Sequence, residues 1–144
     1  MHRNIRFRRL LESGTLPSRG KAGDAGLDLS AAVDVTIQPG TVVVVPTGFA
    51  VEIPDGMVGL LFPRSSLHKR GLKLANSVGV VDAGYRGPLD MALENTSNEA
   101  VAVARGQRLC QLVVMKCIND GGIVEVTELS DSDRGEDGFG STGL

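Results

Sequence analysis

Short apolar runs separated by turn-forming residues recur along most of this chain, and this rhythm constrains the fold more than any other feature. Gly, Pro, Asn and Asp separate the runs, for example at Gln38–Gly40, Pro54–Gly56 and Asn119–Gly122. The spacing predicts an all-β fold with short connections. The runs that have the length and composition of strands are Ile5–Leu10, Leu27–Ala31, Val33–Ile37, Thr41–Pro46, Phe49–Ile53, Met57–Phe62, Gly79–Val81, Leu89–Glu94, Ala100–Ala104, Leu109–Met115 and Ile123–Glu128.

The composition agrees with this prediction. Gly is abundant at 19 residues, Trp is absent and Val is the dominant apolar residue, a mixture that favours short strands and tight turns. Leu89, Met91 and Leu93 alternate with polar or small residues, as in a strand with one buried face. Helical spacing occurs only at Ser65–Arg70, and Gly71 stops it. At 144 residues the chain is expected to form one domain, a jelly-roll-like β-barrel or sandwich with one short helix.

Charge and cysteine content argue against several classes of protein. The net charge is −2, so nothing favours a general nucleic-acid binder, and the arginines near the start are expected on a solvated strand face. Cys110 and Cys117 lie in or just after an apolar run without metal-ligand spacing, which predicts buried, reduced thiols. The sequence shows no signal peptide or membrane-length apolar stretch, so we predict an intracellular protein, cytoplasmic or nuclear.

The last eleven residues, Arg134–Leu144, predict a flexible arm that binds a ligand. They carry too little apolar area to fold alone. Arg134 offers a cation for phosphate, Ser141 and Thr142 offer hydroxyls, and Phe139 offers a ring for stacking on a base. A frayed terminus is the alternative interpretation, and it leaves the isolated ring unexplained. We therefore expect a β domain at residues 1–129 and an arm at residues 130–144.

Two upstream segments place polar groups at candidate strands. Asp28 lies in an apolar strand, where it either closes an Asx-turn or orders water on a hard cation such as Mg²⁺. A strand ends at Pro63 and a short helix follows, so Arg64, Ser65 and Ser66 are candidate ligands for an anion at the start of that helix. Ordinary N-capping by serine is the alternative here, and both interpretations can hold together.

Two further segments carry a candidate base and a candidate donor. Asp82 emerges from an apolar run into a Gly-bounded turn that also holds Tyr85, the only tyrosine. A carboxylate in this position is a candidate general base, and the ring could lie against a sugar. A plain β-hairpin is the alternative. Gln111 offers an amide donor to phosphate, against the simpler interpretation of a polar strand start.

Taken in order, these segments resemble the five motifs of the trimeric deoxyuridine triphosphatases (dUTPases). The resemblance implies a β jelly roll assembled as a homotrimer, in which each active site draws residues from all three subunits. It also implies hydrolysis of dUTP to dUMP and pyrophosphate with Mg²⁺, which limits uracil in DNA and supplies dUMP for dTMP synthesis. The matching segments, which span nearly the whole chain, are Ala25–Leu29, Pro63–Leu67, Gly79–Gly87, Arg105–Gln111 and Arg134–Gly143.

The same resemblance assigns roles to single residues. Asp82 matches the carboxylate that activates water for in-line attack on the α-phosphorus, and Asp28 matches a carboxylate that holds a metal-bound water. Tyr85 matches the ring packed under deoxyribose. Gly84 stands where the family often has an acidic residue, so no second carboxylate is expected there. The remaining matches, all substrate-binding positions, are Arg64, Ser65, Ser66, Asn76, Gly79, Gln111, Arg134, Phe139, Gly140, Ser141 and Thr142.

Two rival functions fit part of the pattern. A dCTP deaminase shares the fold, but that relative uses a Glu base and lacks an arm with a stacking Phe. A binding module of the same fold would sense dUTP or dock a partner without turnover, and it would not need Asp82 as a base. Hydrolysis of a phosphoanhydride needs positioning, neutralised charge and one oriented water, and the candidate residues supply these without a Cys/His or Ser/His nucleophile pair.

Overall fold

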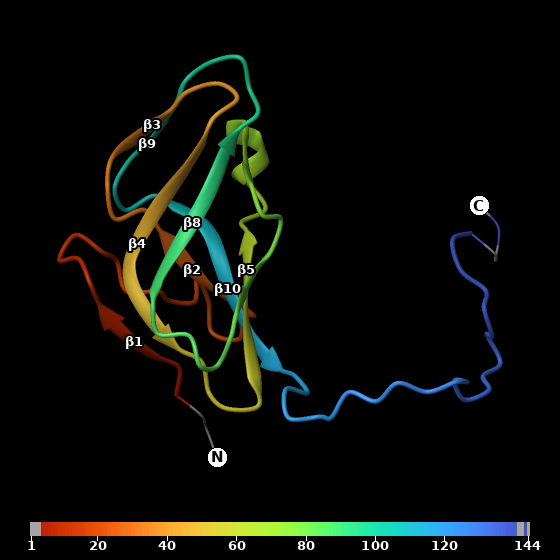
Figure 1. The fold of residues 1–144 in the computed structure, drawn as a ribbon. Coiled ribbons are helices and arrows are strands. Elements are labelled where there is room, and N and C mark those ends of the chain that lie inside the picture. Colours follow the sequence, from red (N-terminus) through yellow and green to blue (C-terminus); the bar gives the residue numbers. More distant parts are fainter. Residues whose placement is uncertain (1–3, 141–142, 144) are drawn as a thin grey trace.

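The computed structural model describes residues 4–140 and 143, in which ten strands and one short 3₁₀ helix alternate with turns (Figure 1). The first strands are β1 (Arg6–Arg9), β2 (Gly26–Ser30), β3 (Val35–Ile37), β4 (Val42–Glu52) and β5 (Met57–Pro63). The helix η1 (Leu67–Arg70) follows, and then β6 (Leu72–Leu74), β7 (Gly79–Val81), β8 (Pro88–Asn95), β9 (Val101–Val103) and β10 (Arg108–Lys116).

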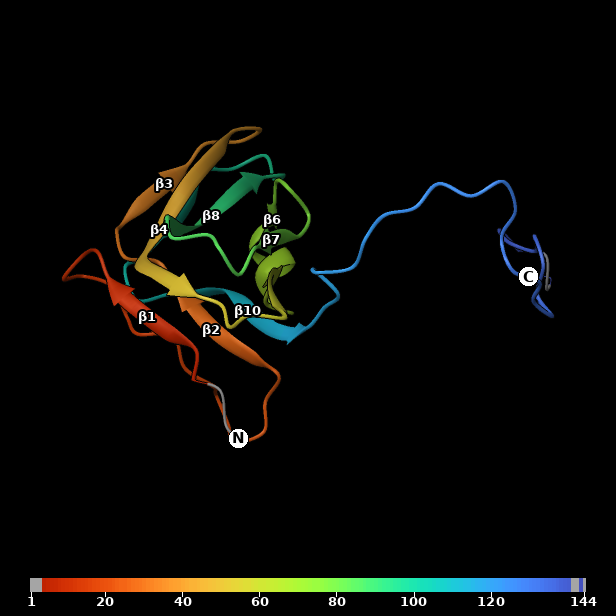
Figure 2. The same cartoon turned by 60° about the horizontal axis from the view of Figure 1, so that its bottom comes forward.

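The strands form two four-stranded sheets and one small two-stranded sheet, all with antiparallel pairing (Figure 2). The first sheet has the order β1-β4-β8-β6, the second β2-β10-β5-β7, and β3 pairs with β9. The core draws on both large sheets, with Leu29, Leu61 and Leu112 from one and Met91 and Leu93 from the other. The prediction of an all-β fold with almost no helix is therefore confirmed.

The predicted barrel is not closed. Among the described residues, β1 and β6 end the first sheet and β2 and β7 end the second, so these strands are edges of their sheets. Only the isolated bridge between Ser18 and Asp28 adds to the β2 edge.

Most predicted strands are present, but two of the predicted runs form one strand and one strand was not predicted. The runs Thr41–Pro46 and Phe49–Ile53 form the single strand β4, because residues 47–48 make an irregularity in the ladder and not a turn. Gly48 takes a positive φ of 79° there, and the Thr47 hydroxyl donates to the Leu89 carbonyl at 2.5 Å, which holds the strand against β8. The strand β6, which follows directly on the end of the helix at Gly71, was not predicted.

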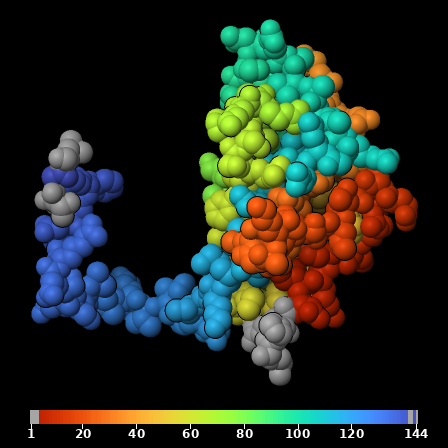
Figure 3. All heavy atoms as spheres, turned by 180° about the vertical axis from the view of Figure 1, so that it is seen from behind, coloured from red at the N-terminus to blue at the C-terminus, as the bar shows by residue number. Residues whose placement is uncertain are grey.

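The predicted strand at Ile123–Glu128 is wrong for this structure. The segment after β10 contains no strand among its described residues and runs away from the sheets (Figure 3). Its apolar side chains are exposed, Ile123 fully and Leu129 by 87%. The composition suits a strand, but a strand also needs a neighbour to accept its backbone hydrogen bonds, and this one has none within the described chain.

The short helix and one of the two cysteines agree with the predictions from the sequence. The predicted helix after Pro63 is η1, and Gly71 ends it in the left-handed conformation at φ 75°. Cys110 is buried, and burial raises the pKa of its thiol to about 12, so it stays protonated and unreactive at neutral pH. Cys117 is also a free thiol, but it is only partly buried, so the prediction of two buried thiols holds for one of them. The described residues include no helix long and apolar enough to cross a membrane.

Candidate active site

Asp28 lies at the centre of a charged cluster formed by three distant segments. It is in the middle of β2, where its side chain is 18% exposed. Arg64 Nε lies 3.2 Å from one carboxylate oxygen, and an Arg108 terminal nitrogen lies 3.4 Å from the other. The ladder register explains the proximity, because Asp28 faces Gln111 on β10, three residues after Arg108. The structure thus brings two cations to a single carboxylate.

The loop between β5 and η1 leaves its hydroxyls available to a ligand. The Arg64 N–H donates to the Leu109 carbonyl at 3.0 Å, which ties the end of β5 to β10. Ser65 and Ser66 are exposed, and Ser66 is the N-cap of η1 without a side-chain capping bond. Of the two interpretations of these serines, side-chain capping is therefore not observed.

Gln111 is held by the backbone on both sides. Its amide nitrogen donates to the Pro63 carbonyl at 3.1 Å, at the end of β5. A Cβ atom added to Gly26 would lie 3.1 Å from Gln111 Cβ and 3.2 Å from its Cδ, so the amide packs directly over this glycine. The Gln111 side chain is therefore fixed at the wall of the site, with one further N–H for a ligand.

These segments line one cavity of about 520 Å³, which we name the cation-lined cavity. Of the predicted site residues it contains Asp28, Arg64, Ser65 and Gln111 but not Ser66. Its lining residues are Gly20, Lys21, Asp24, Ala25, Gly26, Asp28, Arg64, Ser65, Arg108 and Gln111.

A second cavity of about 210 Å³ lies beside the turn that precedes β7, and we name it the hairpin cavity. Asn76, Gly79, Asp82 and Tyr85 all line it, so the structure brings these four predicted residues together. Ser77 has a positive φ of 63° in the turn, and the Val78 N–H donates to the Asn76 carbonyl at 2.7 Å. The remaining lining residues are Leu61, Val80, Val81, Pro88, Leu89 and Asp90.

The loop after Asp82 is fixed by its own side chains. The Tyr85 hydroxyl donates to the Pro88 carbonyl at 2.8 Å, and the Tyr85 N–H donates to the Asp82 carbonyl at 3.1 Å. An Arg86 terminal nitrogen donates to the carbonyls of Ala83 and Tyr85, at 2.7 Å and 3.0 Å. A Cβ atom on Gly87 would lie 2.7 Å from the Tyr85 ring carbon Cζ, so glycine lets the ring lie against the loop. The ring is therefore positioned while 43% of the residue stays exposed.

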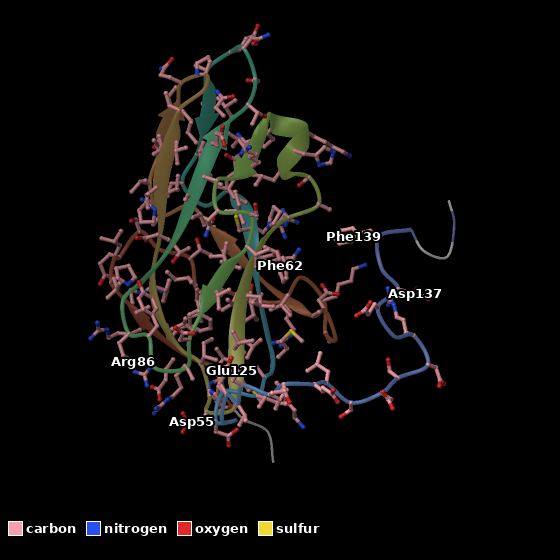
Figure 4. All side chains as sticks on the ribbon, turned by 45° about the vertical axis from the view of Figure 1, so that its right-hand side comes forward. Asp55, Phe62, Arg86, Glu125, Asp137 and Phe139 are labelled. Carbon is pink, nitrogen blue, oxygen red and sulfur yellow. The ribbon has the colours of Figure 1, made fainter. Side chains whose placement is uncertain are left out.

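The described part of the arm lies away from both cavities. Figure 4 places Asp137 and Phe139 on the extended C-terminal segment, apart from the folded part of the chain. Phe139 is fully exposed, and the Arg134 guanidinium donates to the Asp137 carbonyl at 2.8 Å. Arg134, Phe139 and Gly140 line neither cavity, while Ser141 and Thr142 lie outside the described residues.

Sequence reasoning missed four charged residues that line the cavities. Arg108 was inside a recognised segment, and its spacing from Gln111 on one strand was the available signal. Lys21 and Asp24 precede the first recognised segment, and nothing in their spacing marks them. Asp90 supplies a second carboxylate to the hairpin cavity, although none was expected near Gly84, and partial burial raises its pKa.

The family model described as dUTPase matches residues 12–143 of this chain. Curated relatives named deoxyuridine 5'-triphosphate nucleotidohydrolase include one from Mycolicibacterium vanbaalenii, 50% identical over 135 residues, covering 89% of this chain and 87% of the relative. Another, from Thermobifida fusca, is 46% identical over 141 residues, covering 96% of this chain and 78% of the relative.

Solved structures resemble this chain over nearly its full length. The dUTPase of Staphylococcus bacteriophage 80alpha with dUPNHPP superposes with a TM-score of 0.89 at 29% identity, covering 99% of this chain and 100% of the phage chain. A D95N mutant dUTPase of the S. aureus phage phi11, described as coordinating a structural Mg(II) ion, gives a TM-score of 0.80 at 28% identity, covering 88% of this chain and 98% of the phage chain.

Proposed function

This chain belongs to the dUTPase family, the dUTP diphosphatases, and we propose that it hydrolyses dUTP to dUMP and pyrophosphate with Asp82 as the general base. The observation that carries the assignment of Asp82 is its place in the hairpin cavity, beside Tyr85 and the turn at Asn76–Gly79. A carboxylate and a partly exposed ring at the wall of a small cavity suit the binding of a nucleoside. Its phosphates would extend out of the cavity through the open side.

In the proposed reaction Asp82 accepts a proton from a water molecule as the water oxygen bonds to the α-phosphorus. The bond from that phosphorus to the oxygen bridging to the β-phosphate breaks, and pyrophosphate leaves with the electron pair. Nothing in this step requires a covalent intermediate. The contribution of Asp82 depends on its position, which the bonds of Tyr85 and Arg86 within the same loop maintain.

The cation-lined cavity would take the phosphates. Arg64 would bind phosphate from the loop after β5, Ser65 of the same loop and Gln111 of β10 would add neutral donors, and Ser66 would add a hydroxyl from the start of η1. In the same proposal, Arg134 binds the outer phosphate from the arm. The exposed ring of Phe139 stacks on uracil, with Gly140, Ser141 and Thr142 completing the closure.

Asp28 fits the role of a carboxylate in the outer shell of Mg²⁺. Mg²⁺ keeps several waters when it binds through phosphates, so one fixed carboxylate can hold it through a water. The described residues contain no cluster of three or more His, Cys, Asp or Glu side chains that could hold a metal ion. Bound on the triphosphate, Mg²⁺ would neutralise phosphate charge.

Selectivity would follow from the hairpin cavity. Tyr85 packed under the sugar leaves no room for a 2′-hydroxyl, which excludes UTP. The backbone around Gly79 can read uracil with one donor and one acceptor, and mispaired polar groups would then exclude dCTP. On this proposal the protein acts in the cytoplasm or nucleus, where it limits uracil in DNA and supplies dUMP for dTMP synthesis.

We propose that the chain assembles as a homotrimer with shared active sites and that an arm begins near residue 130. The two cavities share no lining residue, and no described residue of the arm lines either, which supports a site completed by other subunits. The exposed apolar segment Ile123–Glu128 suits pairing with another subunit. That segment and its continuation to Asp133 are acidic, whereas the edge strand β1 is basic.

Pyrophosphate release from dUTP, measured beside dTTP, dCTP and UTP, tests the proposal. We expect dUTP to be hydrolysed well above the other three. The Asp82→Asn variant should lose the chemical step and still bind a non-hydrolysable dUTP analogue, because the amide keeps the shape but cannot accept the proton. Ammonia release from dCTP would favour the deaminase, and binding of dUTP without turnover would favour the sensing module.

A further inference from the structure

The cation-lined cavity holds a lysine that the proposed function leaves unused. Lys21 comes from the loop before β2, which forms one wall of the cavity through Gly20, Lys21, Asp24, Ala25 and Gly26. Arg64, Ser65 and Arg108 line the same cavity. Lys21 therefore shares this cavity with the groups proposed to hold the phosphates, although it lies outside every segment recognised in the sequence.

The backbone at Lys21 is fixed by a closed turn. The Lys21 N–H donates to an Asp24 carboxylate oxygen at 2.9 Å, and the Asp24 N–H donates back to the Lys21 carbonyl at 3.1 Å. Arg19 Nε donates to the Asp24 carbonyl at 2.8 Å, and Gly23 takes the positive φ of 90° that the turn requires. The backbone of Lys21 is therefore held in a defined position at the cavity wall, and the side chain extends from there.

The charges of the cavity leave Lys21 without a counter-ion. The lining carries three cations, Lys21, Arg64 and Arg108, and two carboxylates, Asp24 and Asp28. Asp28 is paired with both arginines, and Asp24 accepts the N–H of its own turn. No ion pair among the described residues includes Lys21. With three cations against two carboxylates, the ammonium of Lys21 gives the cavity its net excess of one positive charge.

We infer that Lys21 binds the pyrophosphate end of the substrate, the β- and γ-phosphates that leave together. The inference rests on the proposed function, in which Asp82 and the nucleoside occupy the hairpin cavity and fix the α-phosphorus there. The part of the triphosphate that extends into the cation-lined cavity is then its far end. A lysine is a point charge on a flexible stem, so it can follow the phosphates from ground state to product.

Inhibition constants separate this role from a general effect on the fold. Inorganic pyrophosphate and dUMP are used as competitive inhibitors of the wild type and of Lys21→Ala, Lys21→Arg and Lys116→Ala. Lys116→Ala is the control, because Lys116 is the last residue of β10 and lines neither cavity. Its replacement removes the same positive charge as Lys21→Ala. In Lys21→Ala the inhibition constant of pyrophosphate and the KM for dUTP should both rise about tenfold, as expected for one lost charged contact, while inhibition by dUMP is unchanged.

The conservative variant Lys21→Arg should stay near wild type, and Lys116→Ala should match wild type in every constant. An unchanged inhibition constant of pyrophosphate in Lys21→Ala would overturn the inference. An equal rise in the inhibition constant of dUMP would overturn it as well. A wild type that releases no pyrophosphate from dUTP would count against the proposed function instead. Calorimetric titration of inorganic pyrophosphate into wild type and Lys21→Ala would then decide the role of Lys21 without turnover.

Discussion

Single side chains in this protein take their roles from what surrounds them. Asp28 lies within β2 between two guanidiniums, whereas Asp82 follows the end of β7 and is exposed at a cavity without an ion pair among the described residues. These surroundings support the proposed roles, a carboxylate near the metal for Asp28 and a general base for Asp82. The two guanidiniums reach Asp28 only through the meeting of distant segments.

Phe139 gives the clearest test at the level of a single residue. The ring is fully exposed, so it adds nothing to the packing of the folded part. Phe139→Ala should weaken binding of a non-hydrolysable dUTP analogue by about 1–3 kcal/mol through the lost stack on the base. The melting temperature without ligand should not change. Titration calorimetry and thermal unfolding check the two halves of this prediction, and a large fall in melting temperature would show that the ring packs in the core of the assembly.

At the scale of elements, pairing between strands places the groups proposed to bind phosphate. The ladder of β10 with β2 sets Gln111 opposite Asp28, and the ladder of β10 with β5 sets Cys110 opposite Pro63. The strand β10 therefore lies between β2, which carries the recognised segment Ala25–Leu29, and β5, whose last residue begins the segment Pro63–Leu67. A change in how closely β2 and β10 approach should disturb the site before it disturbs the fold.

Gly26→Ala tests this dependence on close approach. The added methyl group would overlap the Gln111 amide and push it from the Pro63 carbonyl. Because displacements of about 1 Å can cost about 100-fold in rate, we expect kcat/KM for dUTP to fall by about 10- to 100-fold. The loss of stability should be about 1–3 kcal/mol, as for other overpacked positions.

The matched control is Gly122→Ala, where an added Cβ meets open space. Its kinetic constants and unfolding curve should equal those of the wild type. If Gly26→Ala keeps a normal kcat/KM while it remains folded, the position of the Gln111 amide does not matter for turnover.

At the scale of the whole molecule, the separation of the parts predicts complementation between subunits. Two variants are mixed: Asp82→Asn, and a chain that ends at Asp133 and so lacks the arm. Each should be inactive when refolded alone. In a mixed trimer, whichever variant is in the majority, one of three sites joins an intact Asp82 to an intact arm. With equal amounts and random assembly, roughly a quarter of wild-type activity should return.

Pyrophosphate release and the mass of the mixed assemblies are measured together. Mixed trimers without activity would show that Asp82 and the arm serve one site from the same chain. Activity in proportion to the mixed trimers would support the shared site. Because the truncation removes residues that follow the last strand and contribute nothing to the buried core among the described residues, the folded part should assemble normally.

The sequence alone determined the all-β class, most strand positions, the turn after β7 and the short helix, because periodicity, turn residues and a stop at Gly71 are local properties. It also marked Asp28, Arg64, Asp82 and Tyr85 as residues with chemistry. What these residues touch was decided only in three dimensions.

Tertiary structure decided the features that depend on residues far apart in the chain. Pairing of β2 with β10 brought Arg108 to Asp28, and folding of the loop before β2 brought Lys21 into the cation-lined cavity. The same dependence explains why Ile123–Glu128 has the composition of a strand and is not one here. Strand propensity is a property of the residues themselves, but a strand forms only where the edge of another strand accepts its backbone hydrogen bonds.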